Sequence, residues 1–254
     1  MLQPVYSNAY NKRRSTVCRT DVLIQSELRR TFPSYCIKIR VALQCFLHWV
    51  ATLILYQIPV LTDVSAEFES GKIHGIIGHN GSGKTVLMKI ICGLTDADSG
   101  EVFINGERQK NGSAYKFNIG AIIETPGFLP TQSGVKNLQY LASIRRKIGD
   151  EEIKSAMRQV KLNPDDKKHV GKYSLGMRQR LGLAQAIMEN PDILILDEAM
   201  NGLDKDGVNE MRELFLQLKE NGKTIIVASH NSVDIDILCD KVFEIDKGEL
   251  KQVR

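Results

Sequence analysis

Short apolar runs alternate with longer segments of helical periodicity along most of the chain. Four of these runs are almost continuously apolar, and each is four to five residues long. Continuous apolar runs of that length indicate strands that are buried on both faces, as in a parallel sheet. The four predicted strands are Ile73–Ile77, Ile119–Ile123, Ile193–Leu196 and Thr224–Ala228.

The segments between these strands carry apolar residues at the spacing of helices packed on a sheet. An earlier strand with alternating faces is predicted at Val60–Phe68, and Asn105-Gly106 is typical of a two-residue hairpin turn. This order predicts an α/β protein whose ligand lies at the carboxyl ends of the parallel strands. The predicted helices are Val86–Leu94, Val135–Lys147, Ile153–Val160 and Val208–Lys219.

The first part of the chain has a different character. Residues 1–40 contain turn formers and scattered arginines without sustained periodicity, and we interpret residues 1–54 as an extension of uncertain structure. Val41–Thr62 holds no charged residue over 22 positions, a length that could span a bilayer. Gln44, His48 and Gln57 interrupt it and Pro59 lies near its end, so buried or irregular structure is favoured over a membrane-spanning helix and over a membrane-surface or partner-facing helix.

Charge and cysteines narrow the function classes. The net charge is +4, and residues 1–40 contribute +6 of it (eight Lys and Arg against Asp21 and Glu27), which leaves −2 for the remainder. A nearly neutral body argues against a nucleic-acid surface. The five cysteines include no C-x-x-C pair, so a disulfide framework and a zinc site are both unlikely, and a reducing cytosol is favoured.

The strand Ile73–Ile77 leads into the spacing G-x-x-x-x-G-K-[ST], and a helix follows. A strand, a glycine-rich turn and a helix start in this order predict a phosphate-binding loop. Lys84 can reach the β- and γ-phosphates of a nucleotide, and the Thr85 hydroxyl can ligate Mg²⁺. The predicted nucleotide-binding residues of this loop are Gly78, His79, Asn80, Gly81, Ser82, Gly83, Lys84 and Thr85.

Two later strands are also followed by residues with side chains suited to catalysis or metal binding. Asp197 and Glu198 follow the strand Ile193–Leu196, which suits Asp197 to hold Mg²⁺ and Glu198 to polarise an attacking water. His230 ends the strand Thr224–Ala228 and could contact the γ-phosphate and the same water.

With these motifs in order, the sequence resembles the ATP-binding subunit of an ABC transporter. The resemblance adds a signature loop at Tyr173–Met177 and a D-loop at Asn201–Asp204, and it covers about Tyr56 to the C-terminus. It implies a P-loop NTPase fold of the ABC type over residues 55–254, with a mixed sheet core and an inserted helical subdomain at about 125–173. It further implies ATP and Mg²⁺ as cofactors, Glu198 as catalytic base, and Tyr56 stacked on adenine. Two copies would close head to tail, with Ser174 and Gly176 of one contacting the γ-phosphate held by the other.

Two departures from the family pattern point to a subgroup. The signature reads Tyr-Ser-Leu-Gly-Met, a form similar to that of bacitracin-resistance and lantibiotic-immunity ATPases. Glu124 stands where the family usually has Gln, and such a Glu is known from lantibiotic-immunity ATPases. Ionised Glu can only accept hydrogen bonds, and it adds a negative charge near the expected Mg²⁺ and γ-phosphate.

The sequence therefore predicts an ATP-hydrolysing subunit of an exporter that confers immunity or resistance to antimicrobial peptides. It would act at the cytoplasmic face of the cell membrane as a peripheral dimer, with a separate transmembrane permease and without nucleic acid. Another cargo, such as a drug, an ion or a lipid, is a first alternative. A soluble ABC ATPase outside transport is a second, although the paired cassettes and insertions of that class are missing.

Overall fold

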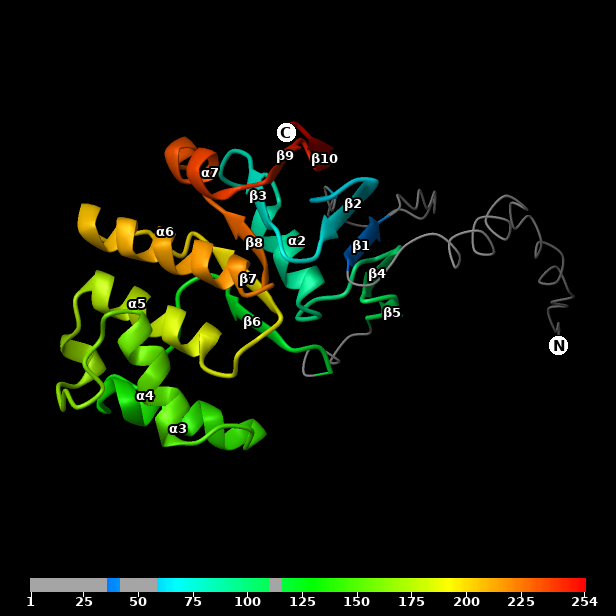
Figure 1. Ribbon diagram of the computed structural model, residues 1–254. Coiled ribbons are helices and arrows are strands. Elements are labelled where there is room, and N and C mark those ends of the chain that lie inside the picture. Colours follow the sequence, from blue (N-terminus) through cyan, green and yellow to red (C-terminus); the bar gives the residue numbers. More distant parts are fainter. Residues whose placement is uncertain (1–35, 42–58, 110–115) are drawn as a thin grey trace, which may run out of the picture. The chain divides into compact units, whose positions relative to one another are not determined.

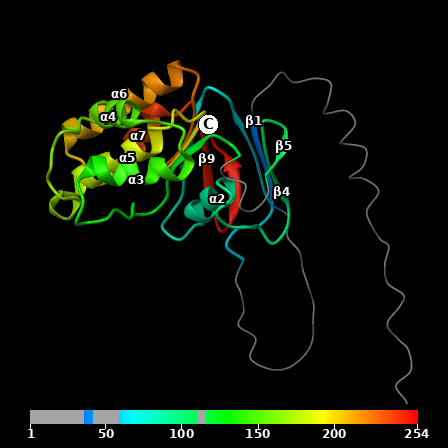
Figure 2. The ribbon, with the colours of Figure 1, turned by 90° about the horizontal axis from the view of Figure 1, so that it is seen from below.

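The computed structural model describes residues 59–109 and 116–254, together with the backbone of residues 36–41. Two sheets form its framework (Figure 1). The first has the strand order β2-β1-β4-β5 and is antiparallel throughout. Figure 2 shows β1, β4 and β5 side by side. Its strands are β1 (Cys36–Val41), β2 (Val64–Glu69), β4 (Glu101–Ile104) and β5 (Glu107–Arg108).

The second sheet has the order β10-β9-β3-β8-β7-β6. It is parallel from β9 to β6, and only β10 runs antiparallel at its edge. The four predicted parallel strands are confirmed as neighbours in the order β3-β8-β7-β6, with β6 at the edge of the sheet. Its strands are β3 (Ile73–Ile77), β6 (Ile119–Ile122), β7 (Ile193–Asp197), β8 (Thr224–Ala228), β9 (Lys241–Asp246) and β10 (Glu249–Gln252).

Helices cover both faces of this second sheet. The predicted helices are confirmed with small shifts of their ends, and α6 begins at Lys205 because the Asp204 side chain accepts a hydrogen bond from the Gly207 N–H at 3.0 Å. In Figure 1, α3, α4 and α5 form a group beside the strands. The helices are α2 (Lys84–Ile91), α3 (Gly134–Arg145), α4 (Asp150–Gln159), α5 (Leu175–Ile187), α6 (Lys205–Glu220) and α7 (Ser232–Leu238), with a 3₁₀ turn at Val170–Lys172.

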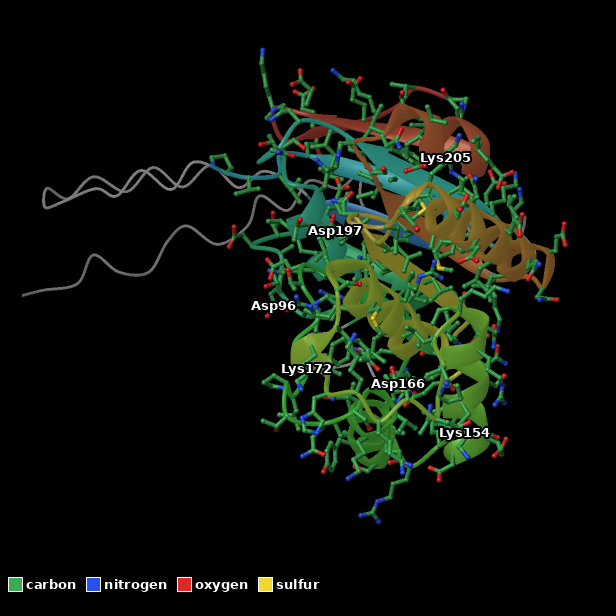
Figure 3. All side chains as sticks on the ribbon, turned by 90° about the vertical axis from the view of Figure 1, so that its left-hand side faces the viewer. Asp96, Lys154, Asp166, Lys172, Asp197 and Lys205 are labelled. Atoms are coloured by element: carbon green, nitrogen blue, oxygen red, sulfur yellow. The ribbon has the colours of Figure 1, made fainter. Side chains whose placement is uncertain are left out.

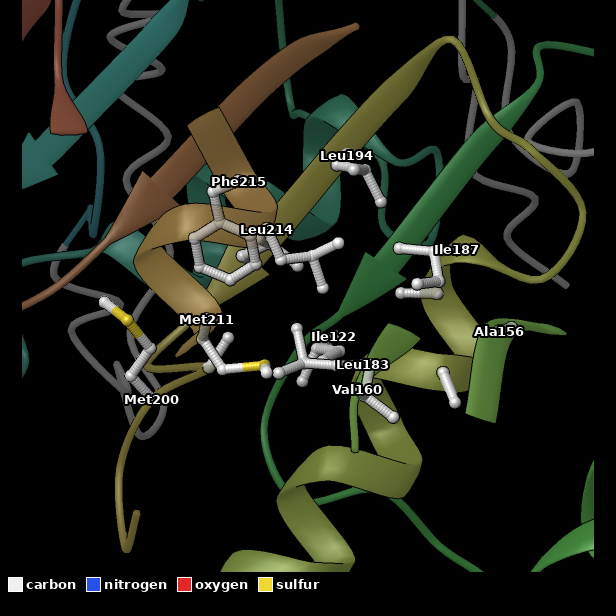
Figure 4. Packing of buried hydrophobic residues seen from close by; sticks show 14 of the residues in the cluster. Ile122, Ala156, Val160, Leu183, Ile187, Leu194, Met200, Met211, Leu214 and Phe215 are labelled. Carbon is white, nitrogen blue, oxygen red and sulfur yellow. The ribbon is translucent and has the colours of Figure 1, made fainter. Parts of the chain in front are cut away.

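Alternate side chains of β7 point to opposite faces of the sheet and contribute to two separate hydrophobic clusters. Leu194 and Leu196 point into a cluster shared with α4, α5 and α6 (Figure 4), whereas Ile193 and Ile195 point into a second cluster with α2 and the first sheet. Because both faces are covered, every position of β7 is buried, as its continuous apolar sequence predicts.

The structure describes only part of the two segments singled out near the start of the chain, the predicted extension 1–54 and the charge-free segment Val41–Thr62. The strand β1 lies inside residues 1–54 and pairs with both β2 and β4, so part of the predicted extension completes the first sheet. Most of the charge-free segment Val41–Thr62 lies outside the described residues. Within residues 59–109 and 116–254, no helix is long and apolar enough to cross a membrane.

The strand β6 packs directly on the backbone of α5 at Gly120. A Cβ there would lie 2.0 Å from the Ala186 carbonyl oxygen and 2.9 Å from Pro191 Cγ. We expect Gly120→Ala to destabilise the fold by about 3 kcal/mol, because a backbone contact cannot move aside as a side chain can. Gly127→Ala is the control, since a Cβ there meets nothing within 4 Å. Equal free energies of unfolding in urea for the two variants would contradict this packing.

Ion pairs join the two sheets at Glu69. This carboxylate on β2 accepts hydrogen bonds from Lys241 of β9 and from Lys72, and these contacts lower its pKa to about 2. A depressed pKa means that the stabilisation is present above pH 4.5 and is lost as pH falls through about 2. Since the Glu69 side chain is 40% exposed, we expect only about 1 kcal/mol from it.

Glu69→Gln should therefore lower the free energy of unfolding at pH 7, and the difference from the wild type should shrink between pH 4.5 and pH 2. Denaturation curves at several pH values measure it. Glu249→Gln, a change on the exposed edge strand β10, should leave the pH profile parallel to the wild type. A Glu69→Gln profile that is also parallel to the wild type would show that Glu69 carries none of the pH dependence.

Candidate nucleotide site

The predicted phosphate loop joins β3 to α2 with three glycines in positive-φ conformations, Gly78 at 152°, Gly81 at 81° and Gly83 at 107°. Gly83 is the N-cap of α2 and provides no side chain to bond the first amides of the helix. These N–H groups and the positive end of the helix dipole therefore remain available to an anion. The hydroxyl oxygen of Ser82 is also buried without a hydrogen-bond partner among the described residues.

Lys84 is buried and folds back over this loop. Its ammonium donates hydrogen bonds to the carbonyl oxygens of Gly78 at 2.7 Å and His79 at 3.1 Å. The His79 ring lies 2.8 Å from the Asn80 carbonyl oxygen through Nδ1, so it contacts the loop backbone. The loop thus holds a positive charge at its centre before any phosphate binds.

The acidic end of β7 lies next to the start of α2. The Thr85 hydroxyl donates to Asp197 Oδ2 at 2.6 Å. Burial, reinforced by the nearby Glu198 charge, raises the pKa of Asp197, whereas the Thr85 hydrogen bond opposes that rise. A hydroxyl and a carboxylate in contact are hard oxygen donors, and they fit the preference of Mg²⁺.

Glu198 follows β7 with φ of 52°, an uncommon conformation for a side chain with a Cβ. Its N–H donates to the Ala228 carbonyl oxygen of β8 at 3.0 Å, which fixes this backbone. Its Oε2 lies 2.9 Å from His230 Nδ1, although the contact is not aligned as a hydrogen bond. The two predicted residues after β7 and β8 are therefore brought together.

A cavity of about 530 Å³ connects the phosphate loop with the carboxylates, and His230 is not among the residues that line it. The phosphate loop, Asp197, Glu198 and Glu124 line it, together with Leu175 and Gln179 of α5. Gln179, for which the sequence predicts no role, donates a hydrogen bond to the Glu198 carbonyl oxygen at 3.3 Å. Glu124 follows β6 with φ of 62°, and its carboxylate accepts a hydrogen bond from Lys89 at 2.7 Å.

Ser174 and Gly176 of the signature lie at the N-terminus of α5. Ser174 is the N-cap, and its hydroxyl accepts from the Met177 N–H at 3.1 Å. A Cβ on Gly176 would lie 3.1 Å from the Gly202 carbonyl oxygen, so the signature and the D-loop are in close contact. Neither Ser174 nor Gly176 lines the cavity of its own chain. Tyr56, predicted to stack on adenine, lies outside the described residues.

Comparison with known proteins decides the family. The model of the ABC transporter family matches residues 61–201. The chain belongs to the ABC transporter family. The predicted fold class and the resemblance stated from the motifs are therefore confirmed, and the chain is an ABC-type ATP-binding protein.

Named relatives extend this result. The chain is 41% identical over 192 residues to the uncharacterised ABC transporter ATP-binding protein YybJ of Bacillus subtilis, covering 76% of this chain and 88% of YybJ. It is 39% identical over 193 residues to the bacitracin transport ATP-binding protein BcrA of Enterococcus faecalis, covering 75% of this chain and 63% of BcrA. It is 35% identical over 191 residues to the lantibiotic transport ATP-binding protein SrtF of Streptococcus pyogenes, covering 75% and 82%.

The lengths of these relatives differ. This chain spans less than two thirds of BcrA and of the uncharacterised protein YdbJ of Bacillus subtilis. Among solved structures, the ATP-binding cassette MJ0796 in a dimeric post-hydrolysis state with ADP and Pi has a TM-score of 0.75 at 20% identity. That match covers 86% of this chain and 99% of MJ0796, and it supports the ABC fold.

Proposed function

We propose that this ABC ATPase drives an exporter that expels or detaches an antimicrobial peptide of the bacitracin or lantibiotic kind. The observation that carries the proposal is Glu124, a carboxylate in place of the usual Gln, set in the cavity that also holds Lys84, Asp197 and Glu198. The names of the relatives BcrA and SrtF, which refer to bacitracin transport and lantibiotic transport, support the same cargo class.

The chemistry follows from positions in the cavity. Lys84 and the amides of the phosphate loop bind and orient the triphosphate. Thr85 and Asp197 would hold Mg²⁺, which would neutralise charge on the phosphate oxygens when bound.

Glu198 accepts a proton from water while the water oxygen bonds to the γ-phosphorus. The bond from that phosphorus to the β–γ bridging oxygen breaks, and ADP leaves with the electron pair. His230, 2.9 Å from Glu198, orients the carboxylate and the water.

The chain would act as part of a larger assembly. Ser174 and Gly176 do not line the Lys84 cavity of their own chain, which suits a head-to-tail dimer in which they face the partner's nucleotide. The helical part at about 125–173, with α3 and α4, is the surface proposed to contact a separate permease at the cytoplasmic face of the membrane.

Cells that carry a deletion of this gene test the cargo directly. We expect the deletion to lower the inhibitory concentration of bacitracin or of a lantibiotic severalfold, and the wild-type gene to restore it. Complementation with Glu198→Gln should fail. Unchanged peptide sensitivity, with altered sensitivity to a small drug or an ion instead, would favour the alternative cargo.

A further expectation concerns Glu124. The Glu124→Gln variant should keep ATP binding, since Gln retains the size of the side chain and an acceptor oxygen. It should alter the coupling of hydrolysis to transport, so that peptide protection falls severalfold while ATP affinity changes less than about threefold. Nucleotide titration of the purified variant and the inhibitory concentration in cells measure the two effects. Loss of ATP binding in this variant would contradict the role assigned to Glu124.

A further inference from the structure

One face of α2 holds two carboxylates from neighbouring strands. Thr85 and Lys89 are four residues apart and therefore lie on the same side of the helix. Thr85 donates a hydrogen bond to Asp197, the last residue of β7, and Lys89 donates one to Glu124, which follows β6. Because β6 and β7 are adjacent parallel strands, these two acidic ends lie side by side, and α2 provides a separate partner for each.

The charges in the cavity make the second contact important. Glu124, Asp197 and Glu198 all line the space proposed for an anionic triphosphate. Lys84 is engaged with carbonyl oxygens of the phosphate loop. Among the described residues, Lys89 is the cation that forms an ion pair with Glu124.

The pair is too exposed to be mainly a stabilising device. The Lys89 side chain is 33% exposed and that of Glu124 is 64% exposed, and such pairs contribute little to folding. Its location suggests a role in the site. The loop after Glu124 continues to Pro126, whose ring lies against Gly182 of α5. Glu124 therefore lies between α2, which follows the phosphate loop, and α5, which begins at the signature loop.

We propose that Lys89 is a positioning residue for Glu124. Its ammonium holds the Glu124 carboxylate at the edge of the cavity and offsets its charge, so that a triphosphate can enter beside three carboxylates. This inference rests on the proposed ATPase function of the same site. At the position where the family usually has Gln, the negative charge of Glu124 would thus be compensated by Lys89 of α2.

A double-mutant cycle tests the inference with ATP as the probe, titrated calorimetrically in EDTA so that the readout does not depend on turnover. Lys89→Met should weaken ATP binding roughly fivefold or more, because an uncompensated negative charge then faces the phosphates. In the Glu124→Gln background the same change should alter affinity less than about twofold. Lys89→Arg should restore affinity to within about twofold of the wild type, since the cation is retained.

The matched control is Lys154→Met, which removes a lysine of similar exposure, 34%, paired with Glu151 on α4. Figure 3 shows Lys154 well apart from Asp197. This control should not change ATP affinity, and thermal unfolding of all variants should stay close to the wild type. Equal effects of Lys89→Met with and without Glu124 would overturn the inference, as would no effect at all. If the wild type itself bound no ATP, the proposed function would fail instead.

Discussion

We expect the Glu198→Gln variant to bind ATP as tightly as the wild type and to hydrolyse it roughly 10²- to 10⁴-fold more slowly, the range contributed by a positioned general base. Gln keeps the shape of the side chain but cannot accept the proton of the attacking water. The backbone of residue 198 is held by the Ala228 carbonyl oxygen, so the geometry of the site should survive the change. Single-turnover hydrolysis and ATP titration measure the two quantities separately.

The control for this variant is Glu213→Gln, which removes an exposed carboxylate on α6, outside the residues that line the cavity. It should hydrolyse ATP at the wild-type rate. Steady-state hydrolysis by Glu198→Gln at the wild-type rate would remove Glu198 from the role of base and leave another group to activate the water.

The second large effect is expected at Lys84. Lys84→Met should lower ATP affinity roughly 10- to 150-fold, the range for losing hydrogen bonds to a charged group. Met keeps the apolar stem of this buried side chain, so the fold should remain intact. The loop carbonyls of Gly78 and His79 lose their donor in this variant, and part of the loss reflects a less ordered loop.

Calorimetric ATP titration of Lys84→Met, with thermal unfolding as the folding control, measures this effect. Lys154→Met is again the matched lysine variant and should bind ATP normally. Wild-type affinity in Lys84→Met would contradict the assignment of this loop as the phosphate site.

The central strands and the phosphate loop were predictable because their signals are local. The strands β3, β7 and β8 are buried on both faces, so nearly every residue in them is apolar and the strands can be recognised from the sequence alone. The hairpin turn at Asn105-Gly106 is confirmed, with φ of 53° and 78° at its two residues. Polar residues Lys241, Glu244 and Asp246 break the run of β9, which is absent from the predicted strands.

Contacts between distant residues could not be predicted from the pattern. Lys89 lies 35 residues from Glu124, and no local spacing connects them. The strand β2 begins at Val64 rather than at Val60, because Thr62 bonds instead to the Gly248 carbonyl oxygen in the turn after β9. The strand β1 was not predicted either, because it is defined by its pairing with the distant strands β2 and β4 and not by a local pattern.

The proposed transport function is tested most directly by purifying the protein from native membranes in mild detergent and identifying the proteins that accompany it. We expect a polytopic membrane protein to co-purify, and we expect the Glu198→Gln variant with ATP to retain it. A parallel purification without residues 1–34, which leaves β1 in place, would show whether that part of the chain is needed for docking. Recovery with ribosomes or nucleic acid, and with no membrane protein, would contradict the transport function and favour an ABC ATPase of another kind.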